Sequence, residues 1–221
     1  QNIQKLIIVA DGELGHLPFE AFLTKPAPQK ITDYNELNYL FNDYKISYNY
    51  SATIWKSNKE AVKNTNNGQL LAMASNYDLK IDSSKIDWRL PYEQDLRGVL
   101  QPLPLARKEI EDLAEGFNGF FAFDKDASEK VFKEKAGNYA VIHLAMHGML
   151  DNKAPILSSL AFTEDGDSLE NNFLHAYEIS KMKLNADLVV LSACETGFGK
   201  FDKGNGIASL AQAFAYAGAP A

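Results

Sequence analysis

The sequence predicts an α/β domain in which a mostly parallel sheet lies between helices. Two near-continuous apolar runs, at residues 139–146 and 186–192, are typical of parallel strands that are covered on both faces. Strand-like and helix-like segments alternate over most of the chain, as they do in βαβ units. Hydrophobic residues make up 46% of the 221 residues and charged residues 23%, which excludes a disordered chain and a coiled coil.

The individual elements follow from hydrophobic periodicity and from the residues that begin and end them. Pro18 fits the first position of a short helix, and Ser51 is a suitable N-cap for the helix that follows it. The expected strands are residues 5–10, 45–50, 69–74, 119–123, 139–146 and 186–192, with an edge strand at 157–163 before a polar turn at 164–167. The expected helices are residues 18–23, the segment after Ser51, and residues 105–117, 126–135 and 206–217.

A long connection and a group of phenylalanines complete this outline. Residues 75–104 contain several prolines and form a longer connection than usual, which indicates a functional or a mobile loop. Most of the phenylalanines are expected in the core rather than on a binding surface. The residues concerned are Phe19, Phe22, Phe41, Phe117, Phe120, Phe121 and Phe123.

The charge balance and the cysteine count restrict the environment and the partners. A formal net charge of −7 argues against nucleic-acid binding through a basic face. No apolar run approaches the length of about 18 residues that a membrane span needs. A single cysteine excludes an internal disulfide and indicates a reducing compartment. We therefore expect a cytoplasmic domain that binds neither nucleic acid nor membranes.

Neither end of the sequence has the character of a natural terminus. An apolar strand-like run begins two residues after Gln1 without an initiator Met, and Ala221 directly follows a helix-like stretch. We therefore expect residues 1–221 to form a single domain that is a fragment of a longer chain.

The residues that carry chemistry follow the two buried strands. The first apolar run ends at His147 and Gly148, and the second leads to Cys194, the only cysteine. Sites in open parallel sheets form at the carboxyl ends of the strands. If the two strands are near neighbours, the imidazole and the thiol come within reach of each other.

A histidine beside a cysteine favours nucleophilic catalysis. A free thiol has a pKa of about 8.5 and is mostly protonated at neutral pH, so an imidazole that accepts its proton increases the reactive thiolate. The backbone N–H groups of Gly148 and Cys194 are suited to stabilise an oxyanion. The residues alone leave a second interpretation open, in which Cys194 and His147 are packing residues. His143, in mid-strand, is expected to be a satisfied polar residue.

Other motifs in the sequence are incomplete. Gly197 and Gly199 lack the third glycine of a dinucleotide-binding loop, and the segment before Lys200 lacks the first glycine of a P-loop. His143 and His147 would suggest a pair of metal ligands if their run were helical, whereas the run predicts a strand and no third ligand is evident. We therefore expect neither a metal nor a cofactor.

Seven sequence blocks carry a resemblance to a known family. VIHLAMHG (141–148) and LVVLSACETG (188–197) resemble the two signature blocks of the CHAT domain, a caspase-like peptidase domain related to caspases and separase. Further blocks agree with the family in order: IVADGELGHLPFEAF (8–22), YNYSA (48–52), LPLARKE (103–109), PILSSLAF (155–162) and GIASLAQAFAYAGA (206–219).

The resemblance implies a caspase-like three-layer sandwich with a central, mostly parallel sheet, and it implies a cysteine endopeptidase that works through an acyl-enzyme. It makes Cys194 the nucleophile, His147 the general base and acid, and the N–H groups of Gly148 and Cys194 the oxyanion hole. A protein or peptide is the implied substrate, no cofactor is needed, and tetratricopeptide repeats are expected in the full-length chain. Related proteases are often latent until they are activated.

The sequence departs from the family pattern at its end. Members of the family continue past the last block into a strand and a loop that shapes the substrate pocket, and the sequence lacks this region. Substrate preference, activating signal, oligomeric state and activity of the fragment therefore stay open. Two other functions stay open as well: a non-catalytic interaction or scaffold module with the same fold, and an acyl transferase or esterase that uses the same thiol.

Overall fold

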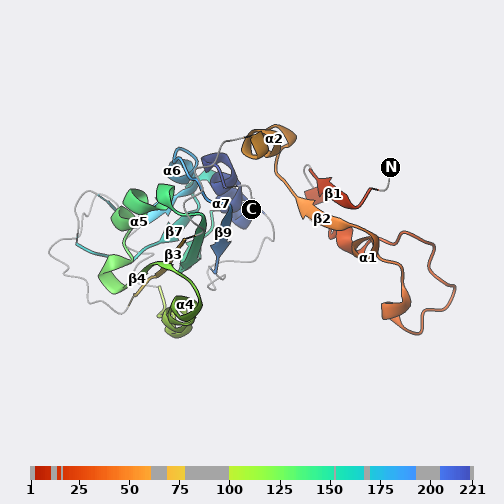
Figure 1. The fold of residues 1–221 in the computed structure, drawn as a ribbon, viewed down its shortest axis with the longest axis horizontal. Coiled ribbons are helices and arrows are strands. Elements are labelled where there is room, and N and C mark those ends of the chain that lie inside the picture. Colours follow the sequence, from red (N-terminus) through yellow and green to blue (C-terminus); the bar gives the residue numbers. More distant parts are fainter. Residues whose placement is uncertain are drawn as a thin grey trace. The chain divides into compact units, whose positions relative to one another are not determined.

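The computed structural model describes residues 3–10, 14–15, 17–60, 69–77, 100–151, 153–166, 170–192 and 205–219, without the side chains of residues 205–209. The chain divides into two compact units, residues 1–59 and residues 60–221. Figure 1 shows the elements of both units, and each unit is described by itself.

The N-terminal unit is built around two short parallel strands, β1 (Lys5–Ile8) and β2 (Lys45–Tyr48). Its helices are α1 (Leu40–Asp43), α2 (Ala52–Glu60, which ends at the boundary of the unit) and the 3₁₀ helices Phe19–Ala21 and Tyr34–Glu36. Ser51 caps α2, because its Oγ accepts a hydrogen bond from the N–H of Ile54 at 3.4 Å. The cap and both strands are confirmed, with each strand ending two residues earlier than expected.

A parallel sheet in the order β4-β3-β5-β9 forms the centre of the larger unit. Its strands are β3 (Leu70–Ala74), β4 (Gly119–Phe123), β5 (Val141–Ala145) and β9 (Leu188–Leu191). Each neighbouring pair runs parallel. The four strands lie inside the segments expected from the sequence, so the prediction of a mostly parallel sheet is confirmed.

Helices cover both faces of this sheet and make a three-layer arrangement (Figure 1). On one face, alternate residues of β3 such as Ala72 pack under Ile110 of α4 (Pro104–Gly116). On the other face, Leu71 and Met73 belong to a larger core that includes Phe132. The helices that contribute to this core are α5 (Glu129–Lys135), α6 (Ala176–Ile179) and α7 (Asn205–Ala217). All five residues of β3 are buried, which explains its uninterrupted apolar sequence.

The strand order reverses between β3 and β5. The crossover through α4 leads from β3 to β4 at one edge, whereas the next crossover, through α5, leads back past β3 to β5. Open α/β sheets bind their ligands at the carboxyl ends of the strands at such a reversal. The topology therefore indicates that a ligand site would lie at the segments that follow β3 and β5.

A second, antiparallel sheet has the order β6-β7-β8. Its strands are β6 (His147–Met149), β7 (Ser159–Ala161) and β8 (Phe173–His175). The expectation of an edge strand at residues 157–163 is wrong, because β7 is the middle strand and all three of its residues are buried. The polar residues 164–167 indicated a strand at the edge of a sheet. They follow β7 in the sequence, whereas the residues of the strand itself are buried.

The phenylalanine prediction is also partly wrong. Phe22, Phe41 and Phe117 are exposed by 44–58%. The buried phenylalanines among the described residues are Phe132, Phe162, Phe173 and Phe214. The helix predictions agree better with the structure: α4 and α7 begin one residue before the expected position, and residues 124–126 form a 3₁₀ turn ahead of α5. None of the described helices has the length and hydropathy needed to cross a bilayer.

Candidate active site

His147 lies at the point where the strand order reverses. It follows β5 by two residues and begins β6, and its side chain is fully buried. Its backbone N–H donates a hydrogen bond to the hydroxyl of Tyr77 at 2.9 Å, and this hydroxyl donates to the carbonyl of Ala161 at 2.6 Å. The Tyr77 and His147 rings lie 4.7 Å apart. Tyr77 follows β3, so the ends of β3 and β5 hold the histidine together.

The two ring nitrogens of His147 have different environments. Nε2 lies 2.6 Å from the main-chain carbonyl oxygen of Gln101. A carbonyl oxygen only accepts hydrogen bonds, so Nε2 carries the proton and donates it. Nδ1 is buried and has no hydrogen-bond partner among the residues that the structure describes. In the neutral ring, Nδ1 is therefore the nitrogen with a free lone pair.

Burial lowers the pKa of His147 below 6.5, and the hydrogen bond to Gln101 opposes this effect only in part. The cause is the cost of removing a charged imidazolium from water. A histidine with a lowered pKa is neutral at pH 7. Its free Nδ1 lone pair can then accept a proton.

Gly148 directs its backbone N–H away from β7. The backbone hydrogen bonds on either side of β7 show which of its residues bond to β8. The N–H of Phe162 donates to the carbonyl of Asn172, and the carbonyl of Ser158 accepts from the N–H of Ala176. The even-numbered residues of this segment therefore bond toward β8. In an antiparallel ladder the odd-numbered residues then bond toward β6. Gly148 is opposite Leu160, an even-numbered residue, so its N–H takes no part in the β6–β7 ladder.

The nucleophile predicted from the sequence, Cys194, lies outside the described residues, as do Gly197 and Gly199. The described chain reaches Ser192, directly after β9. The Ser192 N–H donates to the carbonyl of Leu144 in β5 at 2.9 Å, which continues the strand pairing by one residue. The structure thus places His147 and Gly148 after β5, and Ser192 after the neighbouring strand β9.

His143 is a paired polar residue, as expected from its position in mid-strand. Its Nε2 lies 2.7 Å from Oε1 of Glu109 in α4. Its neighbours in the sheet are Ala72 and Val190, which are apolar.

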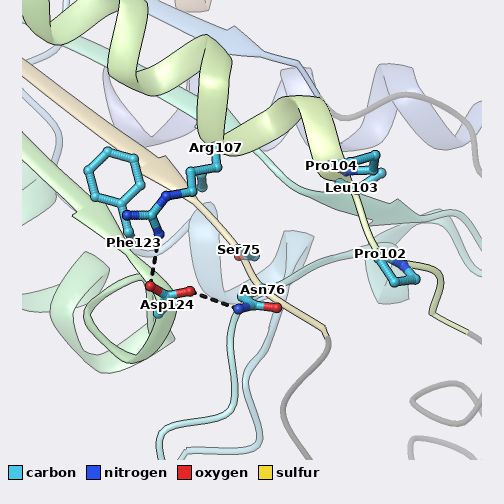
Figure 2. A pocket seen from close by; sticks show the side chains of 9 residues that line it. Ser75, Asn76, Pro102, Leu103, Pro104, Arg107, Phe123 and Asp124 are labelled. Carbon is cyan, nitrogen blue, oxygen red and sulfur yellow. Dashed lines mark hydrogen bonds and ion pairs between the residues drawn. The ribbon is translucent and has the colours of Figure 1, made fainter.

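A pocket of about 170 Å³ opens at the carboxyl ends of β3 and β4. Figure 2 shows its polar side chains together on one side and the proline-containing segment before α4 on the other. The residues labelled there are Ser75, Asn76, Pro102, Leu103, Pro104, Arg107, Phe123 and Asp124. Tyr77 and Gln101, which hold His147, are the chain neighbours of Asn76 and Pro102, so the pocket lies at the same sheet edge.

The charged groups in this pocket neutralise each other. Asp124 accepts hydrogen bonds from Asn76 at 2.7 Å and from Arg107 at 2.9 Å, and these two bonds lower its pKa against the opposing effect of burial. Arg107 also pairs with Glu111. The hydroxyl of Ser75 is buried and has no hydrogen-bond partner among the described residues. The pocket therefore offers one free polar group and no uncompensated charge.

Three carboxylates that do not line this pocket have the spacing of metal ligands. One oxygen each from Glu129, Glu170 and Glu178 lies within 4.8 Å of the others. The ammonium group of Lys133 already stands among them, at 2.6, 2.7 and 3.0 Å from the three carboxylates. Because a cation is thus supplied by the chain, we do not assign a metal site there.

Sequence reasoning did not find two residues that hold the histidine, Tyr77 and Gln101. Tyr77 follows a buried strand by three residues, and the same rule that indicated His147 would have found it. Gln101 contributes only its main-chain carbonyl, so its side chain carries no signal. Glu109 lies in the LPLARKE block but had no assigned role.

These features define a class of protein: a three-layer α/β fold whose parallel sheet carries a buried histidine where the strand order reverses. A family model for the CHAT domain matches residues 1–221, the whole chain. The chain belongs to the CHAT domain family, and its sheet of order β4-β3-β5-β9 between helices is the caspase-like fold. It is thus a caspase-like, peptidase-related domain. A search among curated proteins found no match.

Proposed function

We propose that this domain is a cysteine endopeptidase in which Cys194 is the nucleophile and His147 is the general base and acid. The observation that carries the proposal is the His147 ring. Its Nε2 is held by the Gln101 carbonyl, while Nδ1 is buried, has its lone pair free in the neutral ring, and has no partner among the described residues. A buried polar atom without a partner costs free energy, and a catalytic role is one explanation for its presence.

The strand register supports the choice of Cys194 as the partner of His147. In the β5–β9 pairing, Leu144 is opposite Leu191. His147 follows Leu144 by three residues, and Cys194 follows Leu191 by three residues. Adjacent strands lie about 4.8 Å apart. His147 and Cys194 therefore follow paired positions of β5 and β9 by the same number of residues in the sequence.

The chemistry then proceeds through an acyl-enzyme. Nδ1 of His147 takes the proton from the Cys194 thiol, and the thiolate sulfur forms a bond to the carbonyl carbon of the substrate. The N–H groups of Gly148 and Cys194 donate to the oxyanion of the tetrahedral intermediate. As the C–N bond breaks, Nδ1–H protonates the leaving amine. Nδ1 then takes a proton from water, whose oxygen attacks the thioester and releases the acid and the thiol.

The substrate, the partners and the location are part of the same proposal. We propose a protein or peptide substrate, tetratricopeptide repeats elsewhere in the full-length chain, a requirement for activation, and a cytoplasmic location. The single cysteine supports the last point, because a reactive thiol persists in a reducing compartment.

The test uses a diverse peptide mixture and mass spectrometry to detect cleaved bonds. Cys194→Ala should abolish cleavage, and His147→Ala should reduce it by at least about 100-fold, as expected for loss of a general base. His175→Gln, a histidine at the end of β8, is the control and should leave cleavage unchanged.

Three outcomes would contradict the endopeptidase assignment. Cleavage retained by Cys194→Ala would exclude a thiol mechanism. A longer version of the chain that cleaves no peptide, and that binds a partner equally well with and without Cys194→Ala, would favour the scaffold module. Turnover of thioesters or esters without any peptide cleavage would indicate an acyl transferase or an esterase.

A further inference from the structure

A carboxylate on α4 joins the central strand β5 to the chain that leads to the proposed nucleophile. Oε1 of Glu109 lies 2.7 Å from Nε2 of His143, and Oε2 accepts a hydrogen bond from the hydroxyl of Ser192 at 3.0 Å. The three residues come from separate elements: helix α4, the middle of β5, and the position directly after β9.

The chemistry of the three groups fixes the direction of both hydrogen bonds. An ionised carboxylate is only an acceptor, so the hydroxyl of Ser192 donates to one oxygen and the ring N–H of His143 donates to the other. Hydrogen bonds to a charged acceptor are shorter and stronger than neutral ones. Glu109 can make both bonds at once because a carboxylate has two oxygens. An amide at this position has one acceptor and one donor, so it cannot accept from both groups, and one of the two bonds is lost or reversed in direction.

Ser192 is held from two directions. Its main-chain N–H donates to Leu144 in β5, and its side chain donates to Glu109 in α4. Cys194 follows two residues later, and two extended residues span at most about 7 Å. The segment that carries the thiol therefore starts from a residue whose backbone and side chain are both held.

The contribution of this arrangement to stability is expected to be small. The Glu109 side chain is 37% exposed, and ion pairs at such positions are worth about 1 kcal/mol or less. The β5–β9 pairing is already made by main-chain hydrogen bonds. What the carboxylate adds is a defined geometry immediately before the segment with the nucleophile.

We propose that Glu109 is a positioning residue for the thiol chemistry: it orients the chain at Ser192, with His143 holding the second carboxylate oxygen. This inference rests on the proposed Cys194–His147 function. Its consequence is that substitution of Glu109 changes the reactivity of Cys194 without touching either reacting group.

The experiment measures the rate of Cys194 alkylation by iodoacetamide from pH 5 to 9. The chain has one cysteine, so the rate reports this thiol alone. Glu109→Gln and Ser192→Ala should each lower the rate at pH 7 by about tenfold, because small displacements of a reacting group have large effects on rate. The pH midpoint should rise toward the value of about 8.5 of an ordinary thiol.

Two further variants separate positioning from a general effect on the fold. Glu111→Gln, on the same helix, removes a carboxylate that pairs with Arg107 and should leave the rate unchanged. Ser192→Thr keeps the hydroxyl and should restore the rate that Ser192→Ala loses. The double variant Glu109→Gln/Ser192→Ala should be no slower than the slower single variant, because both changes break the same contact.

The outcomes distinguish this inference from the proposed function. If His147→Ala is alkylated more slowly than the parent, but Glu109→Gln and Ser192→Ala are alkylated as fast as the parent, the positioning role is wrong and the proposed function stands. If His147→Ala has no effect on the parent, both are wrong. If Glu109→Gln fails to fold, the comparison of Ser192→Ala with Ser192→Thr still decides, and equal rates for these two would overturn the inference.

Discussion

At the scale of single residues, the protonation state of His147 is set by its surroundings. The Gln101 carbonyl selects the tautomer with the proton on Nε2, and burial lowers the pKa of the ring. The histidine is therefore neutral at pH 7 and able to accept a proton. The sequence alone predicted that His147 and Cys194 follow buried strands, but it could not predict the tautomer, because the carbonyl of Gln101 is contributed by the main chain.

We predict that His147 titrates below pH 6.5 in Cys194→Ala, a variant without the thiol. Because the folded pKa is lower than the unfolded value, stability linked to this group is present above pH 6.5 and is lost as the pH falls through the folded pKa. NMR of labelled imidazoles, with His147→Gln to assign the signal, measures the midpoint. A midpoint at 6.5 or higher would mean that the ring is not buried as described.

At the scale of elements, the sequence predicted the parallel strands well and the small sheet poorly. β3, β4, β5 and β9 each have an apolar run bounded by turn residues. This pattern is visible in the sequence of each strand without knowledge of which strands lie beside it. β6 is different, because its three residues, beginning with His147, directly follow the apolar run of residues 139–146 and were not expected to form a strand. Without β6, the position of β7 in the middle of its sheet could not be recognised.

A glycine in β4 tests the close pairing of β3 and β4. A Cβ added at Gly119 would lie 1.9 Å from the carbonyl oxygen of Leu70, which is main chain and cannot move aside easily. Gly119→Ala should therefore lower the free energy of unfolding by at least about 2 kcal/mol. The matched change Gly116→Ala, at the end of α4, meets no atom within 4 Å and should be neutral or stabilise by up to about 1 kcal/mol. Equal effects in urea unfolding would contradict this description of the sheet.

The carboxylate cluster around α5 predicts a pH dependence of stability. Burial raises the pKa of Glu129 to about 7, while Lys133 opposes the shift and Glu170 and Glu178 add to it. Because the folded pKa exceeds the unfolded value, the protonated group stabilises the fold fully below pH 4.5, and this contribution is lost as the pH rises through 7.

Glu129→Gln should remove this loss, so that its melting temperature changes less between pH 6 and 8.5 than that of the parent. Glu134→Gln, an exposed residue of the same helix, should behave like the parent. The same decline with pH in Glu129→Gln and in the parent would show that Glu129 is not its source.

At the scale of the whole molecule, the two units contribute unequally to the core. Among the described residues, every buried hydrophobic side chain except Leu37 lies in residues 60–221. This unit also contains the parallel sheet, both helix-covered faces and His147. The sequence did not indicate such a division, because strand-like and helix-like segments alternate in both units. The interpretation of residues 1–221 as a single domain remains a prediction.

We expect residues 60–221, produced alone, to unfold in one cooperative transition. The melting temperature should stay within about 5 °C of the full chain, which for a domain of this size corresponds to a difference of one to two kcal/mol. Calorimetry on both chains makes the comparison. Loss of the transition would show that the N-terminal residues are needed to complete the core.

The central claim is that His147 activates Cys194, and the rate of thiol alkylation tests it most directly. The rate is measured from pH 5 to 9 for the full chain and for His147→Ala. The account predicts a rate that stays high well below pH 8 in the parent and falls when the imidazole is removed. A rate that follows an ordinary thiol with a pKa near 8.5 and is the same in both proteins would contradict it.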